Sequence, residues 1–120
     1  MERKIGEVKV SNEAIASIAG ITASNVDGVV GLSGGIRDGI VNILTRGQVT
    51  KGVKVEVGQE EVIVDVSIIL RYGVKIFDVS FSVQEAVKKA IQDMTGLRVV
   101  EVNVFVEGVE IVEKEERRLK

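Results

Sequence analysis

The spacing of hydrophobic and polar residues predicts a strand followed by a helix at the start of the chain. Val8 and Val10 alternate with charged neighbours, a pattern typical of a short strand with one apolar face. Ser11 then supplies an oxygen suited to capping a helix, and Ile15 and Ile18 recur at helical spacing. The helix should end near residue 24, and the small residues along it would allow a neighbouring element to approach closely.

A glycine-rich segment separates this helix from a second predicted helix. Residues 31–35 read Gly-Leu-Ser-Gly-Gly, and isoleucines at positions 36, 40 and 43 restart the helical period. Gly47 follows Arg46 and is the expected C-cap. The pattern therefore predicts a short helix over residues 36–46, directly after a turn at Asp27-Gly28 and the glycine-rich segment.

The strand signal is strongest beyond residue 50. Valines at 53, 55 and 57 alternate with Lys54 and Glu56, and a similar alternation runs from 62 to 70, so these stretches should form an antiparallel hairpin. A helix is predicted from near Asp78 to Thr95-Gly96, with Met94 on its apolar face and Gln92 facing outward. Residues 100–106 predict a last strand, with Asn103 on the side opposite its valines.

These elements predict an α+β fold in a single small domain, with the order β-α-α-β-β-α-β. We expect a three- to four-stranded antiparallel or mixed sheet with helices on one face, formed by residues 1–112. Residues 113–120 would be a charged C-terminal tail. A sheet of at most four strands leaves two open edges, and open edges are sites where another chain can pair.

The amino-acid composition excludes several kinds of catalytic and metal-binding site. The 120 residues include no Cys and no His, so thiolate nucleophiles, imidazole bases and the usual zinc sites are impossible. We expect no catalytic residues, no cofactor and no metal. The four aromatic residues are too few for a base-stacking platform, and Tyr72 is expected to pack its ring over the end of the sheet.

Charge and hydropathy predict a chain that does not cross a membrane. Sixteen basic and 18 acidic residues give a net charge of -2, which provides no overall attraction for nucleic acid or anionic lipid. The first residues lack the apolar run of a signal peptide, and no uncharged stretch approaches the roughly 20 residues that span a bilayer. A cytoplasmic location fits the absence of cysteine.

The glycine-rich segment is the one candidate binding loop, formed by Gly31, Ser33, Gly34, Gly35 and Arg37. A phosphate could bind its backbone N–H groups at the start of the following helix. Alternatively, Gly31 to Gly34 match the GXXG loop with which KH domains clamp nucleic acid, although Leu32 and Ser33 are neutral where such loops are usually basic. A structural role for the glycines, supplying unusual backbone angles, is the favoured interpretation.

An ordered set of short stretches resembles the alkaline shock protein family of Gram-positive bacteria, also called the envelope stress response family. The stretches that carry this resemblance are residues 26–29 (VDGV), 51–57 (KGVKVEV), 71–76 (RYGVKI), 83–87 (VQEAV), 94–97 (MTGL) and 100–106 (VEVNVFV). Together they cover nearly the whole chain, from about Ile5 to Val109.

The resemblance implies a cytoplasmic, non-enzymatic protein that acts in cell-envelope homeostasis through protein partners. Some relatives self-associate and are held at the membrane by a separate anchor protein, and others are linked to fatty-acid synthesis at acetyl-CoA carboxylase. It thus implies a homo-oligomer that can lie peripheral to the membrane through a partner. Nucleic-acid binding by the glycine-rich segment remains the alternative.

Overall fold

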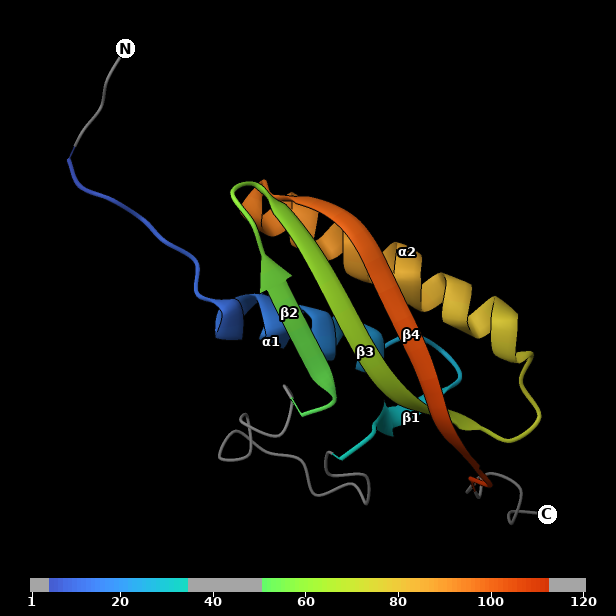
Figure 1. Ribbon diagram of the computed structural model, residues 1–120. Coiled ribbons are helices and arrows are strands. Elements are labelled where there is room, and N and C mark those ends of the chain that lie inside the picture. The colour runs from blue at the N-terminus through green and yellow to red at the C-terminus, as the bar shows by residue number, and fades with distance from the viewer. Residues whose placement is uncertain (1–4, 35–50, 113–120) are drawn as a thin grey trace.

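The computed structural model describes residues 5–34 and 51–112, and these residues form two helices and four strands (Figure 1). In chain order the elements are α1 (Asn12–Ser24), β1 (Val29–Leu32), β2 (Val53–Val57), β3 (Glu61–Arg71), α2 (Ile76–Thr95) and β4 (Arg98–Glu110).

The sheet is mixed and is organised around β3. On one side, β2 pairs antiparallel with residues 62–66 of β3 and β1 pairs antiparallel with residues 68–70. On the other side, β4 pairs parallel with β3 from Glu61 to Arg71. Among the described residues, β4 is therefore an edge strand along its whole length.

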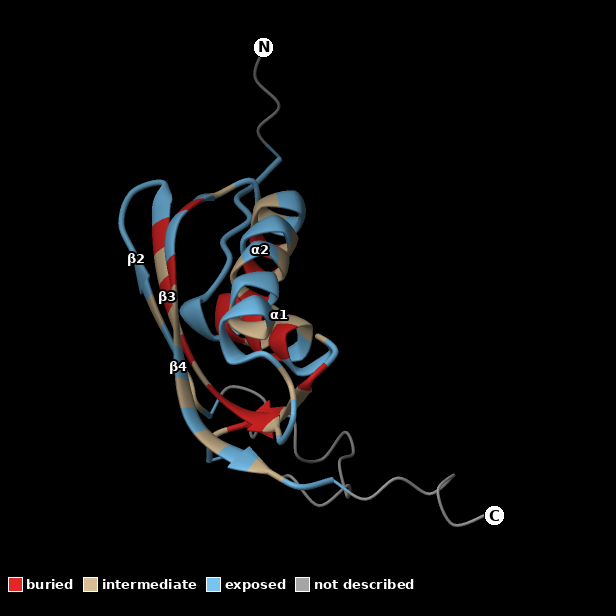
Figure 2. Ribbon diagram, turned by 90° about the vertical axis from the view of Figure 1, so that its right-hand side faces the viewer, coloured by how far each residue is buried: buried red, intermediate tan, exposed pale blue. Residues whose placement is uncertain are grey.

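Both helices cover the same face of the sheet, and the opposite face carries no helix from the described residues (Figures 1 and 2). Every second residue of β3 from Val62 to Leu70 faces the helices, and all of these residues are buried. Val83, Val87 and Ile91 of α2 pack against them, together with Ile15 of α1. The predicted fold class, an α+β domain with a mixed sheet and helices on one face, is confirmed.

Helix α1 begins where the sequence predicts. The Ser11 side-chain oxygen accepts a hydrogen bond from the Ala14 N–H at 3.0 Å, which satisfies one of the free donors of the first turn. Ala16, Ala19 and Gly20 are buried on the face of α1 that packs into the structure. Because these side chains are small, α1 can lie close to α2 and to the sheet, as predicted.

Helix α2 begins two residues before the predicted start and ends at Gly96, whose φ of 81° is left-handed. Glycine adopts this conformation without a Cβ clash, so the predicted C-cap is confirmed. Two predicted orientations on this helix are wrong. Met94 is exposed, and Gln92 turns toward the sheet, where its Oε1 accepts from the Val99 N–H at 3.0 Å.

The strand predicted at residues 7–10 is wrong, because this segment pairs with nothing in the described structure and Val8 is 94% exposed. A strand needs a partner, and the alternating pattern predicts a face without supplying one. A strand forms instead at Val29–Leu32, inside the segment expected to be a turn and loop. The helix predicted over 36–46 and the tail at 113–120 lie outside the described residues.

The first testable prediction concerns the turn into β2. Gly52 and Gly73 have similar positive φ values, 89° and 103°, so alanine carries a similar conformational cost at both positions. A Cβ at Gly52 would lie 2.7 Å from the Ser33 carbonyl oxygen, whereas a Cβ at Gly73 meets nothing within 4 Å. Gly52→Ala should therefore destabilise the protein by about 2 kcal/mol more than Gly73→Ala. Urea denaturation of both variants measures the difference, and equal losses would contradict it.

The second prediction concerns Ser80 in α2, whose hydroxyl is buried and has no hydrogen-bond partner among residues 5–34 and 51–112. Removing an unpaired buried hydroxyl removes its desolvation cost, so Ser80→Ala should stabilise the protein by about 1 kcal/mol. Ser82→Ala is the matched control, because Ser82 is exposed on the same helix and gains the same helix propensity. Thermal unfolding should show a higher melting temperature for Ser80→Ala than for Ser82→Ala.

Candidate protein-interaction surface

The glycine-rich segment is largely part of the sheet. Gly31 is buried in β1 opposite Ile69, and the Ser33 N–H donates to the Ser67 carbonyl oxygen at 2.9 Å. The prediction of a loop is therefore wrong for Gly31 and Leu32. Gly34 is exposed with a φ of 88°.

Gly35 and Arg37 lie outside the described residues, so a ligand for this segment stays a prediction. A GXXG clamp needs its loop backbone open to a phosphate chain. Of residues 31–34, the described part of the segment, only Gly34 is exposed to solvent.

All four aromatic side chains of the protein are exposed. The exposed fractions are 69% for Tyr72, 87% for Phe77, 58% for Phe81 and 49% for Phe105. The expectation that Tyr72 packs over the end of the sheet is thus wrong. Aromatic side chains bury large apolar areas when they are covered, and they are enriched at protein interfaces. Phe77 and Phe81 lie on α2, Phe105 lies on β4, and Tyr72 follows directly after β3.

Side chains from α2 cover the backbone at the beginning of the β4 edge. The Gln84 Nε2 donates to the Val102 carbonyl oxygen at 2.9 Å, and the Val99 N–H donates to Gln92 Oε1 at 3.0 Å. These two glutamines satisfy groups that point away from β3. Another strand cannot pair with the edge at these two backbone groups, because the glutamine side chains already occupy them.

Further along, the β4 edge is open. Residues 101–106 pair with β3 in continuous register, so Val104 and Val106 point their backbone groups the same way as Val102, away from β3. No hydrogen bond from any described residue reaches these groups. An open row of N–H and C=O groups is a template for pairing with a further strand.

A groove of about 350 Å³ lies between α2 and the first part of β4, next to the stretch that Gln84 and Gln92 close and before the open stretch begins. Its lining includes Phe81 and Lys88 from α2 and Val100 from β4. Val100 lies where the β4 register shifts against β3, and such a bulge re-aims a side chain. Phe77 lies one turn before Phe81, on the same side of the helix. We define the β4 edge surface as the open edge from Asn103 to Val109 together with Phe77, Phe81 and Val100.

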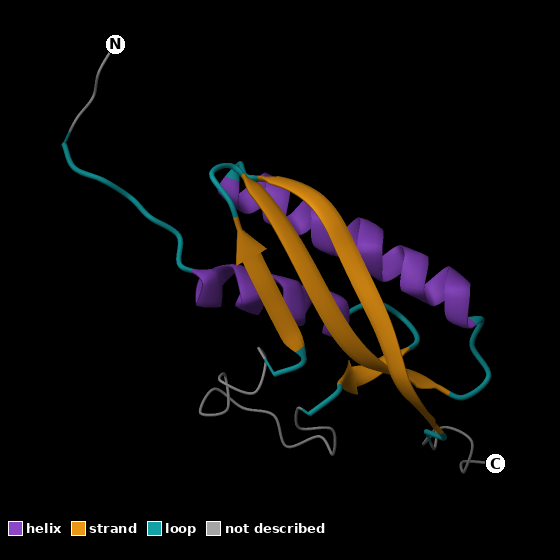
Figure 3. Cartoon of the chain, viewed as in Figure 1, coloured by secondary structure: helices purple, strands orange, loops and turns teal. Residues whose placement is uncertain are grey.

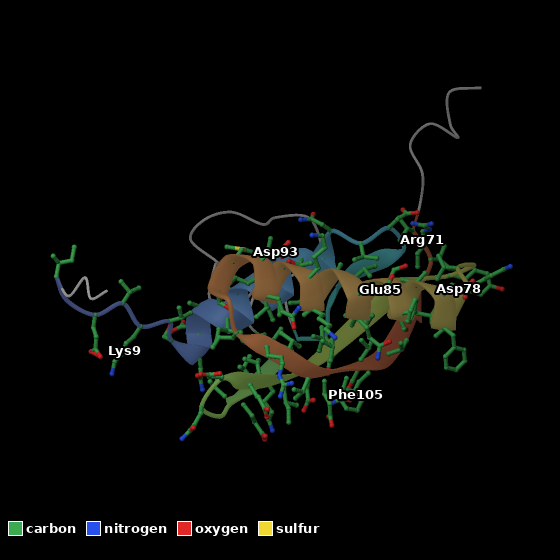
Figure 4. The ribbon with its side chains drawn as sticks, turned by 90° about the horizontal axis from the view of Figure 1, so that it is seen from above. Lys9, Arg71, Asp78, Glu85, Asp93 and Phe105 are labelled. Atoms are coloured by element: carbon green, nitrogen blue, oxygen red, sulfur yellow. The ribbon has the colours of Figure 1, made fainter. Side chains whose placement is uncertain are left out.

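The uncovered face of the sheet is more polar. Phe105 projects from it, on the side away from the helices (Figure 4). Beside it, the Asn103 Nδ2 donates to Asp65 Oδ1 at 2.9 Å and to Glu101 Oε1 at 3.2 Å. Asn103 thus faces away from the valine side, as predicted, and its amide is occupied within the protein. These two hydrogen bonds join Asp65, Glu101 and Asn103 into one group on this face.

The described residues contain no group of three or more acidic side chains that could hold a metal ion. Figure 3 shows the two described helices in purple. Neither of them is long and apolar enough to cross a membrane. On the outer side of α2, Lys89 Nζ lies 2.7 Å from Asp93 Oδ2, and this hydrogen bond raises the pKa of Lys89 above its ordinary value. That side of the helix is a solvated, charged face.

Sequence reasoning missed Phe77 and Phe81, although a signal was present. The apolar period of this helix runs through Val79, Val83 and Val87, and the two phenylalanines lie two positions out of that period. At 3.6 residues per turn they point away from the buried side. A pair of large apolar residues out of phase with the core predicts an exposed patch.

The fold and the β4 edge surface together define a small α+β domain with an open sheet edge suited to protein contact. The chain belongs to the alkaline shock protein 23 family, described as having a cell envelope-related function, because the family model matches residues 1–111. The resemblance found in the sequence is thereby confirmed.

Relatives support this membership. The chain is 37% identical over 113 residues to "Uncharacterized protein YloU" of Bacillus subtilis, covering 92% of this chain and 94% of the relative. It is 36% identical over 115 residues to "Stress response regulator gls24 homolog" of Streptococcus pyogenes, covering 92% of this chain and 62% of that relative. The name of this second relative is that of a stress response regulator.

Among solved structures, the chain is similar to MamM-CTD, with 18% sequence identity and a TM-score of 0.48. The similarity covers 80% of this chain and 96% of that one.

Proposed function

We propose that this protein is a non-enzymatic adaptor or regulator in the response to cell-envelope stress, and that it binds protein partners at the β4 edge surface. The observation that carries the proposal is the open backbone edge of β4 beside the exposed Phe81 and Val100. The envelope-related family and the stress response regulators among the relatives support the cellular context.

The geometry suits recognition by strand addition. An extended partner segment beside Val104 and Val106 would form backbone hydrogen bonds with the open edge, which supply affinity for any extended chain. Alternate side chains of that segment would lie on the α2 side of the sheet, next to Phe81 at the border of the groove between α2 and β4. Contacts with Phe81 and Val100 would then select apolar residues at those positions.

The partner class follows from the same proposal. A membrane-anchored protein offering an extended segment would bring this chain to the envelope from the cytoplasm. Acetyl-CoA carboxylase, the link expected from the family resemblance, is a second partner to test. In either case, this protein acts by contact and requires no cofactor.

The third prediction tests the surface by substitution. Phe81→Ser and Val100→Ser should each weaken partner binding about tenfold, because an apolar anchor at an interface commonly contributes about one to two kcal/mol. Ile21→Ser is the matched control, since Ile21 is an exposed apolar residue on α1. The measurement is crosslinking of the full chain in its native cells during envelope stress, with the captured proteins identified and quantified by mass spectrometry.

Folding must be checked alongside capture. All three side chains are exposed, so the melting temperatures of the variants should agree with that of the unchanged protein. Equal capture by Phe81→Ser, Val100→Ser and the control would contradict the proposed surface. RNA binding at low salt that is lost in Gly34→Asp and retained in Phe81→Ser would favour the KH-like alternative instead.

A further inference from the structure

The first described residues form an extended arm whose outer part is uncovered in the described structure, while Val10, next to α1, is 42% exposed. We define the N-terminal arm as residues 5–10. Ile5 is 99% exposed and Val8 is exposed almost as fully. The arm leaves the start of α1 and projects away from the sheet, with Lys9 well separated from the body (Figures 1 and 4). Its ion pair, Lys9 Nζ to Glu7 Oε1 at 4.0 Å, lies within the arm itself.

The arm has the pattern of a strand and lacks a partner strand in the described structure. Val8 and Val10 fall on one side, and Glu7 and Lys9 fall on the other. Such alternation suits a strand with one apolar side against a core or groove and one side in water. The same molecule carries an open edge, from Asn103 to Val109, of a length comparable to the arm.

The arm is poorly placed to reach the β4 edge of its own chain. Helix α1, which follows the arm, packs against β1, β2 and β3, whereas α2 packs against β4. Figure 1 shows the arm leaving on the β2 side of the sheet. A six-residue arm extends at most about 20 Å, and crossing to the far edge would use most of that length.

We infer that the N-terminal arm of one copy of this chain adds as a strand to the β4 edge of a second copy. In that position, Val8 and Val10 lie on the helix side of the sheet, against Phe81 and Phe77. Glu7 and Lys9 lie on the uncovered side, next to Phe105. This inference rests on the proposed function, because it assigns an occupant to the surface proposed there for protein contact.

The β2 edge is the competing acceptor, and the structure favours β4. Strand β2 has five residues, and Lys54 and Glu56 on it are exposed and charged. Strand β4 has 13 residues and lies beside Phe81, which lines the groove between α2 and β4, so it offers both backbone pairing and an apolar contact for the valines. An arm on β2 would pair but would leave Phe77 and Phe81 uncovered.

Disulfide mapping between copies tests the assignment directly, because the chain contains no cysteine of its own. One copy carries Lys9→Cys, and a second, size-tagged copy carries Phe105→Cys or Glu107→Cys. Neighbouring strands lie about 5 Å apart, within the distance that a disulfide bridges. The matched control is Lys54→Cys, an exposed position on the other edge.

The expected result is a mixed disulfide with Phe105→Cys or Glu107→Cys at about ten times the yield obtained with Lys54→Cys. Equal yields for the two edges, or a preference for Lys54→Cys, would overturn the assignment to β4. Both reaction partners are full-length chains with exposed substitutions, so a folding defect does not account for a negative result.

Sedimentation of the full chain provides the second measurement. Val8→Ser should weaken self-association about tenfold, and Lys9→Ser should change it less than about twofold, because only Val8 faces the helix side of the sheet. A protein that stays monomeric up to about 0.5 mM would overturn the inference. Equal self-association of the Val8→Ser and Lys9→Ser variants would also overturn the inference.

The two proposals can fail separately. If no mixed disulfide forms and Phe81→Ser still loses its crosslinked partner in cells, the arm inference fails and the proposed function stands. If the disulfide forms at β4 and Phe81→Ser captures the same partners as the Ile21→Ser control, the arm inference stands and the proposed function fails.

Discussion

Parallel pairing between β3 and β4 determines how the rest of the molecule is arranged. Parallel neighbours cannot be joined by a tight turn, so the chain must return along the sheet before β4 begins. Helix α2 makes that return with 20 residues, about 30 Å of helix against about 36 Å of β3. The crossover places α2 beside β4, and it leaves β4 at the edge. The groove between them is therefore a direct result of the topology.

The core that this topology encloses is entirely aliphatic. Its buried members are isoleucine, leucine, valine and alanine, and β-branched side chains on β3 fill most of the space under the helices. Valine and isoleucine suit a strand because their χ1 angles are already restricted. The aromatic side chains of the protein are thus outside the core, where a partner can cover them.

How far the sequence predicted the structure depends on the kind of pattern. Regular valine alternation identified β2, β3 and β4, and Ser11 and Gly96 marked helix ends because capping depends on local residue chemistry. Local patterns also predicted the β2–β3 hairpin, because a short turn joins the two strands, but they do not show which strands pair when they lie far apart in the chain. The alternation of Val8 and Val10 predicts a strand, but it supplies no partner for one. Strand β1 is not predicted, because the glycine at position 31 indicates a loop and the strand forms only through its pairing with β3. The sequence predicted two open edges for the sheet, but not that β4 forms one of them with Phe77 and Phe81 beside it, because the strand order depends on long-range pairing.

The central position of β3 has a consequence for amide hydrogen exchange. Strands on both sides hold its backbone groups and both helices cover its inward side chains, so its amides should exchange only when the whole domain unfolds. The outward amides of Val104 and Val106 belong to the same sheet, yet in an isolated copy they are open to solvent. Their exchange rate therefore reports whether the edge is occupied, without any label or substitution in the protein.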